Sequence, residues 1–359
     1  MSDGKGLDVE AQRRHFPGLA RQGNGGPAVF LDGPAGSQVP QGVIDRVADC
    51  LAYHNANDGG SFATSAEVGA MVAEARQAVA DLIGAADADE IVFGPNMTTL
   101  TFALSRSLGR TWSAGDEVVV TCLDHDANVT PWVLAARDAG AVVRYLDIDP
   151  ADCTLRLDRL EDLLSPKTRL VAVGVASNAV GTIHPVAHMV AAAHRVGALV
   201  FLDAVHGVPH LPAEVQRWGA DFLACSAYKF FGPHQGILWG RRELLVRLPA
   251  YKVRPAPETL PGRWMTGTPS FEAITGVRAA VDYLTDLGRQ SAATPPADRR
   301  TALLAAYAAI RQHESALAAH FLTGLARLPG WRVWGITDLD RLSERVSTFG
   351  LTHEHQEPR

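Results

Sequence analysis

The sequence predicts an α/β protein in which a mostly parallel, doubly wound sheet forms a large domain and a smaller α+β domain follows it. Two observations carry this prediction. Short apolar runs alternate with amphipathic helical patterns along most of the chain, which is typical of strands and helices that wind into a parallel sheet. The 359 residues also exceed what one hydrophobic core usually organises, so a second, smaller domain is expected.

Seven apolar runs are the predicted strands, and several are apolar throughout, as in strands covered on both faces. They are residues 91–93, 117–121, 142–146, 170–175, 199–203, 222–225 and 236–239. The helical patterns between them are residues 66–83, 98–108, 132–139, 157–164 and 186–195. Ligands of such sheets bind beyond the carboxyl ends of the strands, so functional residues are expected there.

The chain divides into an N-terminal segment (residues 1–29), a large domain (30–285) and a small C-terminal domain (286–359). Residues 286–299 are polar and contain two consecutive prolines, which predicts a linker. An Ala- and Leu-rich stretch, 302–328, predicts one helix or a helix pair, and 331–333 and 345–351 predict strands of the small domain.

Composition excludes several classes of partner. The net charge is −6 and no long basic run occurs, which argues against nucleic acid and against an anionic membrane. The first 22 residues lack the apolar core of a signal peptide, and no apolar run approaches the roughly 18 residues that span a bilayer. The four scattered cysteines lack CxxC spacing, so we expect no disulfide framework, no metal site and a cytoplasmic location.

Two charged residues at strand ends indicate the chemistry. Asp203 ends the apolar run 199–203, and Lys229 follows the run 222–225 within the sequence Ser226-Ala227-Tyr228-Lys229. A pyridoxal phosphate (PLP) enzyme needs such a pair, because the lysine forms a Schiff base with the aldehyde and the acid keeps the pyridine nitrogen protonated. Aromatic neighbours would desolvate the lysine and favour its neutral, nucleophilic form. Each residue also has a plain structural alternative, an ion pair for Asp203 and a lysine head in water for Lys229.

Residues after other strands are weaker candidates for cofactor contacts when taken singly. Together they are stronger, because they follow successive strands of one predicted sheet. Residues 94–99 (GPNMTT) open a helix whose N–H groups and hydroxyls suit a phosphate, although an ordinary cap by Asn96 or Thr98 explains them too. His125 could stack on a planar cofactor or be a polar surface residue. Asn178 could bind a phenolic oxygen or form the turn before Gly181.

Taken together, these segments resemble the class V aminotransferase-fold PLP enzymes, closest to the cysteine desulfurase and selenocysteine lyase group. The resemblance runs from about Phe30 to the last residue. The segments that carry it are LDGPAGSQ (31–38), NAN (55–57), NVTPW (128–132), SNAVGT (177–182), SAYK with FGP (226–229 and 231–233) and MTGTP (265–269).

The resemblance implies PLP-dependent transferase fold type I, with the cofactor in the large domain, and a role for each matching residue. Lys229, His125 and Asp203 would be catalytic, with His125 stacked on the ring and Asp203 on the pyridine nitrogen. The remaining cofactor contacts would come from Met97 (through its N–H), Thr98, Asn178, His206, Ser226, Tyr228 and Thr268. Thr268 would reach the phosphate of a neighbouring subunit, which implies a homodimer with shared sites. Ala35, Gly36, Asn55 and Asn57 would line the entrance for an amino acid substrate.

The chain departs from this family at several positions. His206 stands where desulfurases usually have Gln, Tyr228 where they have His, and Met97 where they have Thr. Thr99 replaces a glutamate. The group near the phenolic oxygen is therefore changed, while Tyr228 can still donate one hydrogen bond to the phosphate.

The small domain is expected to be shortened, because the family continues past the point that matches Arg359. The missing elements carry the persulfide-forming cysteine and a carboxylate-binding arginine. Three hypotheses follow. The first is a PLP enzyme with desulfurase-like C–S lyase chemistry, or else an aminotransferase or epimerase. The second is a PLP-binding protein with little catalysis, and the third is a scaffold without cofactor.

Overall fold

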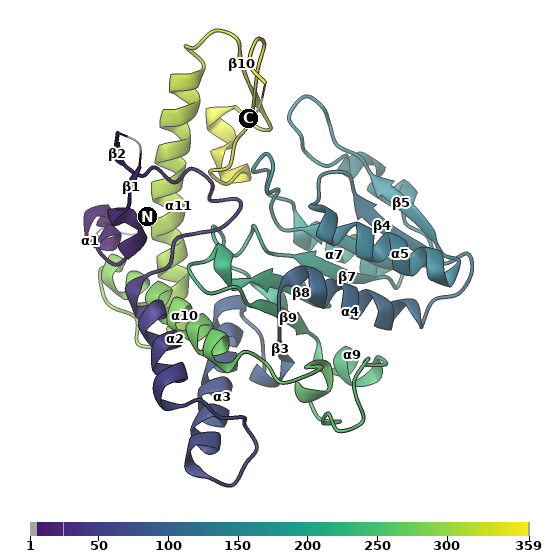
Figure 1. Ribbon diagram of the computed structural model, residues 1–359. Helices are drawn as coiled ribbons and strands as arrows, with labels where there is room; N and C mark the ends of the chain where they lie inside the picture. The colour runs from purple at the N-terminus through teal and green to yellow at the C-terminus, as the bar shows by residue number, and fades with distance from the viewer. Residues whose placement is uncertain (1–5, 24, 358–359) are drawn as a thin grey trace.

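The computed structural model describes residues 6–23 and 25–357, and its centre is a seven-stranded sheet in the order β3-β9-β8-β7-β6-β4-β5 (Figure 1). β4 to β8 are parallel, whereas β9 runs antiparallel to its two neighbours. The strands are β3 (Ile91–Gly94), β4 (Glu117–Thr121), β5 (Val142–Leu146), β6 (Thr168–Gly174), β7 (Leu199–Asp203), β8 (Phe222–Ser226) and β9 (Gly236–Gly240). All seven predicted strands are confirmed.

Both faces of the sheet are covered, because successive side chains of the central strands enter two separate cores. Val200 and Leu202 of β7 belong to one core, and Phe201 between them belongs to the other. Helices α3, α7, α10 and α11 supply the first core, and α4, α5 and α9 supply the second. This two-sided burial explains why the strands are apolar throughout and confirms the doubly wound α/β prediction.

The helices agree with the sequence patterns where those were periodic. Five helices of the described residues were not predicted, namely α1, α2, α8, α9 and α10. The structure has α1 (Val9–Arg13), α2 (Gln41–Tyr53), α3 (Ala63–Ile83), α4 (Met97–Gly109), α5 (Thr130–Ala139), α6 (Leu160–Leu163), α7 (Val186–Arg195), α8 (Val215–Trp218), α9 (Arg242–Arg247), α10 (Phe271–Ser291) and α11 (Arg299–Leu325). The predicted helix 157–164 is only a 3₁₀ turn followed by the single turn of α6. No helix in the part of the chain described is long and apolar enough to cross a membrane.

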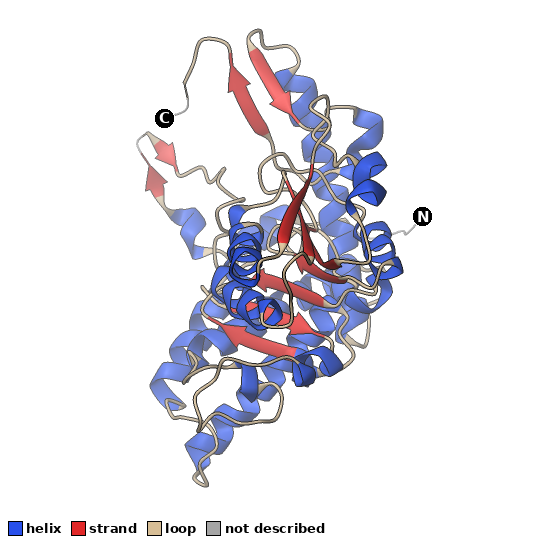
Figure 2. Ribbon diagram, turned by 90° about the vertical axis from the view of Figure 1, so that its right-hand side faces the viewer, coloured by secondary structure: helices blue, strands red, loops and turns tan. Residues whose placement is uncertain are grey.

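Two predictions for the C-terminal region were wrong. Residues 286–291 are not linker but the end of α10, whose buried face includes Leu287, Gly288 and Ser291. The segment 345–351 is not a continuous strand, since only β11 (Gly350–His353) pairs with β10 (Trp331–Trp334). These two strands form a separate small sheet beside the end of α11 (Figures 1 and 2). Two further short strands, β1 (Gln22–Gly23) and β2 (Gly26–Pro27), pair with each other near the N-terminus.

Gly288 allows α10 and α11 to cross at close range. A Cβ at this position would lie 1.8 Å from the carbonyl oxygen of Ala302, in the first turn of α11. A side chain of any size therefore cannot fit without moving one helix, so glycine is required by the packing rather than by its backbone angles.

We expect Gly288→Ala to lower the free energy of unfolding by about 1–3 kcal/mol, because the methyl group forces the two helices apart. Gly324→Ala is the matched control, since Gly324 lies in α11 and a Cβ there would meet only open space. That variant should be neutral or more stable by up to about 1 kcal/mol. Denaturant unfolding of both variants measures the difference, and equal stability of Gly288→Ala and wild type would contradict the packing argument.

Candidate functional site

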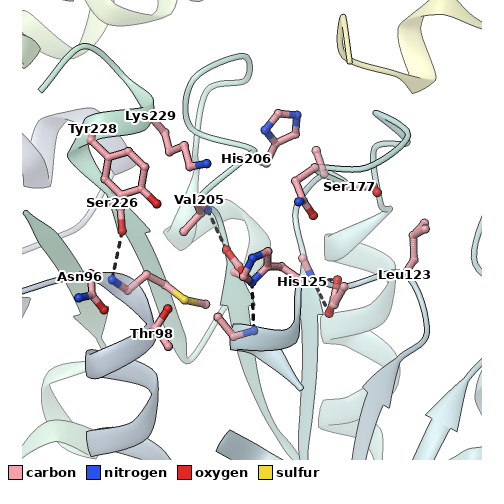
Figure 3. Close-up of a pocket in the computed structure, with 17 residues that line it drawn as sticks. Asn96, Thr98, Leu123, His125, Ser177, Val205, His206, Ser226, Tyr228 and Lys229 are labelled. Atoms are coloured by element: carbon pink, nitrogen blue, oxygen red, sulfur yellow. Dashed lines mark hydrogen bonds between the residues drawn. The ribbon is translucent and has the colours of Figure 1, made fainter. Parts of the chain in front are cut away.

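A pocket lies where the carboxyl ends of β4, β7 and β8 meet the start of α4 (Figure 3). Its position is that expected for a ligand site in a doubly wound sheet. The residues that line it are Asn96, Met97, Thr98, Leu123, Asp124, His125, Ala127, Gly174, Ala176, Ser177, Asn178, Asp203, Val205, His206, Ser226, Tyr228 and Lys229. The structure thus brings together most of the residues that the sequence singled out.

Lys229 ends a 3₁₀ turn that directly follows β8, so the strand fixes where its side chain begins. Its ammonium donates to the carbonyl of Pro34 and lies 5.1 Å from the centre of the Tyr228 ring. Desolvation lowers the pKa of Lys229, and the carboxylates of Asp203 and Asp32 oppose this shift. The amine is therefore closer to its neutral form than an exposed lysine, which suits a nucleophile.

Asp203 is the last residue of β7, and only 7 % of it is exposed. Its Oδ1 accepts a hydrogen bond from the Val205 N–H at 2.9 Å. Desolvation raises the pKa of Asp203 to about 6, although this N–H and the nearby side chains of His125 and Lys229 lower it. A buried carboxylate with so few donors is stabilised by a cation placed against its second oxygen.

His125 follows β4 and is held by its own backbone. Its Nδ1 accepts the Ala127 N–H at 3.1 Å, so the neutral ring carries its proton on Nε2. The preceding residue, Asp124, accepts two bonds from the Gly174 N–H (2.9 and 3.1 Å) and one from Asn128 Nδ2 (2.9 Å). These bonds attach the His125 loop to the end of β6.

The start of α4 forms the end of the pocket suited to an anion. Asn96 caps the helix by accepting the Thr99 N–H at 2.8 Å, which confirms the ordinary cap that the sequence allowed. The Met97 N–H donates to Ser226 Oγ at 3.1 Å, and Thr98 also faces the pocket. Strand β9 packs close behind, because a Cβ on Gly236 would lie 2.4 Å from the Asn96 carbonyl carbon. Helix N-termini with free donors bind phosphate groups well.

Asn178 and His206 line the opposite wall. Asn178 is half-buried, whereas only 4 % of His206 is exposed. His206 Nε2 lies 2.8 Å from Thr348 Oγ1, so a residue of the C-terminal region reaches the pocket wall. Burial lowers the pKa of His206 to about 3, with further lowering from His210 and Lys229, so this ring is neutral near pH 7.

Several predicted residues lie outside this pocket. Thr268, Asn55, Asn57 and Ala35 are exposed on the same chain and do not line it. Gly36 packs against Tyr228, where a Cβ would lie 3.3 Å from the ring, and it lines a second cavity that also reaches Lys229. In that position Gly36 can border a route to the lysine.

Sequence reasoning missed Asp124, which stands next to the predicted His125. The signal was present, since an acid shortly after the continuous apolar strand 117–121 occupies the same kind of position as Asp203. Desolvation raises the pKa of Asp124 to about 8, and the charge of the nearby Asp203 contributes to this rise. Within the described residues, no group of three or more His, Cys, Asp or Glu side chains could hold a metal ion.

Comparisons with known proteins show the family of the chain. A family model described as "Aminotransferase class-V" matches residues 29–357. A cysteine desulfurase from Pectobacterium atrosepticum is 34 % identical over 97 % of this chain and 83 % of its own length. A probable cysteine desulfurase from Streptomyces coelicolor is 32 % identical over 97 % of this chain and 84 % of its own length.

Solved structures give the same result for the fold. The crystal structure of the cysteine desulfurase CsdA from Escherichia coli has a TM-score of 0.76 at 27 % identity, covering 91 % of this chain and 79 % of that one. The apo structure of a cysteine desulfurase from Thermococcus onnurineus NA1 has a TM-score of 0.81 at 24 % identity, covering 97 % and 82 %. The latter likeness supports the fold alone.

The Asp124–Asp203 pair predicts a pH effect on the protein without ligand. Folded Asp124 keeps a proton up to a pKa of about 8, whereas the unfolded chain has lost it, so stability falls as pH rises toward 8. His206 and His184, whose pKa values are lowered to about 3 and about 4, act oppositely but only below about pH 6.5. The melting temperature should therefore fall between about pH 6.5 and pH 8.

Thermal unfolding measured across this range tests the effect. In Asp203→Asn the decline should move to lower pH, because one cause of the raised Asp124 pKa is removed. A melting temperature that rises across the same range in the wild type would show that the Asp124 proton has been assigned wrongly.

Proposed function

Because the chain belongs to the class V aminotransferase family, we propose that it is an enzyme that breaks a carbon–sulfur bond in an amino acid such as L-cysteine. The family implies PLP as cofactor, and the chain is a cysteine desulfurase-like member of it. The observation that carries the proposal is the meeting of Lys229, Asp203 and His125 at the ends of three strands of one sheet.

The pocket residues fit PLP by their donors and charges. Asp203 has one free carboxylate oxygen in a desolvated place, and a protonated pyridine nitrogen is the cation that would match it. The N-terminus of α4, with Thr98 and Ser226, would hold the phosphate. When bound, PLP supplies an electron-accepting ring that stabilises negative charge on the substrate's α-carbon.

The remaining chemistry belongs to side chains of this chain. Lys229 would hold the cofactor covalently and, once released by substrate, would take or return the α-proton with its amine. His125 would lie against the ring, and the proton on its Nε2 points away from the Ala127 bond and is free for transfer. Asn178 and His206 would flank the phenolic oxygen of the cofactor, and Tyr228 the phosphate.

We further propose a homodimer with shared sites, in which Thr268 completes the site of the neighbouring subunit. Thr268 is exposed and does not line the pocket of its own chain. Large apolar side chains are exposed along α2 and nearby loops, namely Ile44, Leu51, Tyr53, Phe62, Tyr251 and Val253. A second copy that covered these side chains would remove them from water.

Lys229→Ala should abolish the visible absorption band that forms with PLP and should abolish turnover, because the covalent link and the proton carrier are lost together. Lys229→Arg is the matched control, since it keeps a positive charge but cannot form the link. It should also lose turnover. Absorption spectra with and without amino acids measure both properties, and turnover that survives in Lys229→Ala would refute the assignment.

The products of the wild-type reaction distinguish the possible activities. With L-cysteine and excess dithiothreitol, desulfurase-like chemistry yields alanine, sulfide and oxidised dithiothreitol. Pyruvate with ammonia and sulfide would indicate C–S cleavage by β-elimination. A keto acid that keeps its sulfur, formed only when a second keto acid is added as amino-group acceptor, would indicate an aminotransferase, and loss of optical activity alone would indicate an epimerase. A visible band that no amino acid changes would instead indicate a PLP-binding protein with little catalysis.

Mixed dimers test the shared site. Lys229→Ala and Thr268→Ala, each impaired alone, should regain activity when refolded together, because one site of the mixed dimer then has an intact lysine and an intact threonine. The recovered activity should lie well below that of the wild type, because only one site in each mixed dimer is complete. Activity that does not rise above the two separate variants would contradict a shared site.

A further inference from the structure

A buried cluster of two histidines and a glutamate connects the pocket wall to helix α11, and the chemistry described above uses only one of the three, His206. His206 and His210 lie in the turn after β7, with ring centres 5.0 Å apart at an angle of 64°. His210 Nδ1 lies 2.7 Å from Glu314 Oε1 on α11. The other histidine, His206, contacts the hydroxyl of Thr348 through its Nε2.

The charges of the cluster follow from its burial. The side chains of His210 and Glu314 are each only 18 % exposed, and Glu314 Oε2 has no hydrogen-bond partner among the described residues. A carboxylate so placed needs a positive partner, and His210 is in contact with it. Two imidazolium rings with centres 5.0 Å apart would repel each other strongly away from water. The two rings therefore cannot both be charged, and burial lowers the pKa of His206 to about 3, so His206 is the ring that stays neutral.

We propose that His210 and Glu314 are a positioning pair that keeps His206 neutral and correctly oriented at the wall of the cofactor pocket. In Figure 3 the side chains of His206 and Lys229 extend into the same pocket, which Asn178 also lines. A neutral ring there can hydrogen-bond the phenolic oxygen of the cofactor without adding a second cation beside Lys229. This inference depends on the proposed function, because it assigns a role toward the same cofactor.

The groups that surround His206 support this distribution of charge. Lys229 after β8 and Asp203 on β7 line the same pocket as His206, and His210, which contacts Glu314 on α11, lies on its other side. Desolvation is the main reason that the pKa of His206 is low, and the charges of His210 and Lys229 act in the same direction. Protonation of His206 is thus opposed by its burial and by the cations on both flanks.

The cluster also ties the C-terminal region to the pocket. Ser347 Oγ donates to the Glu314 carbonyl at 2.9 Å, and the Val346 N–H donates to the carbonyl of Gly181, in the loop that carries Asn178, at 2.8 Å. A shift of α11 would therefore move both residues that flank the expected phenolic oxygen. His206 is oriented by Thr348, and the His210–Glu314 pair adds to the burial that keeps its ring neutral.

The order in which the two rings take protons is measured by NMR of the ligand-free protein with labelled histidine, with His206→Gln used to assign its signal. In the wild type, His210 should be protonated before His206, which stays neutral at about pH 5. In His210→Gln the pKa of His206 should rise by about one unit, because a like charge is removed. In Glu314→Gln the gap between the two protonation steps should narrow by about one pH unit, because His210 loses its counter-charge.

His313→Gln is the control, because His313 lies on α11 beside Glu314 and faces the second cavity. It should leave both protonation steps unchanged. In the protein loaded with PLP, the pH dependence of the visible band should shift in His210→Gln but not in His313→Gln. A purely structural role would change stability without moving either titration.

The pair would be refuted if His206 took its proton first in the wild type, or if its titration were the same in His210→Gln. The order in the wild type does not depend on His210→Gln or Glu314→Gln, so the test holds even where one of these two variants fails to fold. If PLP produced no band dependent on Lys229 while the histidine titrations behaved as expected, the proposed function would fail but the charge order within the cluster would hold.

Discussion

The buried carboxylate at the end of β7 is the constraint on which the site depends. Asp203 lies in the middle of the sheet, between β6 and β8, where water cannot hydrate it well. A charge in such a place destabilises the fold unless a cation meets it. The neighbouring strand ends bring His125 and Lys229 near it, and both lower its pKa. The pocket is therefore arranged around a negative charge that the positive side chains of the chain balance only in part, and a cationic ring nitrogen of the proposed cofactor would complete the balance.

Close backbone packing holds the groups around that carboxylate. Gly174 ends β6 and donates its N–H to Asp124, and a Cβ there would lie 2.7 Å from Asp124 Oδ1. Gly236 lets the start of β9 touch the cap of α4 in the same way. Behind His125, Trp132 donates its indole N–H to Asn128 Oδ1 at 3.0 Å, and Asn128 in turn donates to Asp124. The loops that carry the functional groups are thus bound to strand ends, which keeps the site in place before any ligand arrives.

Features that leave a local pattern in the sequence were predictable, whereas features that depend on contacts between residues far apart in the chain were not. The strands were predictable because burial on both faces leaves continuous apolar runs such as Leu199–Asp203, and Asp203 was visible as the charge that interrupts one. Helix α10 was not predicted, and its end was taken for a linker, because residues 286–291 are polar on one face and only their contact with α11 shows that Leu287 and Gly288 are buried. Arg345 was predicted in a strand, yet its side chain is buried in the interior. It is held there by hydrogen bonds to carbonyl groups that include that of Val180, far away in the sequence. Likewise no local pattern joins His210 to Glu314, which lies 104 residues away.

Arg345 shows how the C-terminal region is fastened to the site without a counter-charge. Only 2 % of it is exposed, and its guanidinium donates to the carbonyls of Ile336, Val180, Val346 and Thr348. Desolvation lowers its pKa to about 10, which still leaves it charged near neutral pH. The five donors of a guanidinium can satisfy several carbonyls at once, so one side chain joins the loop that carries Asn178 to the segment that carries Thr348. The position of His206 is therefore fixed by an arginine it does not touch, and the pocket wall and the C-terminal region move as one unit.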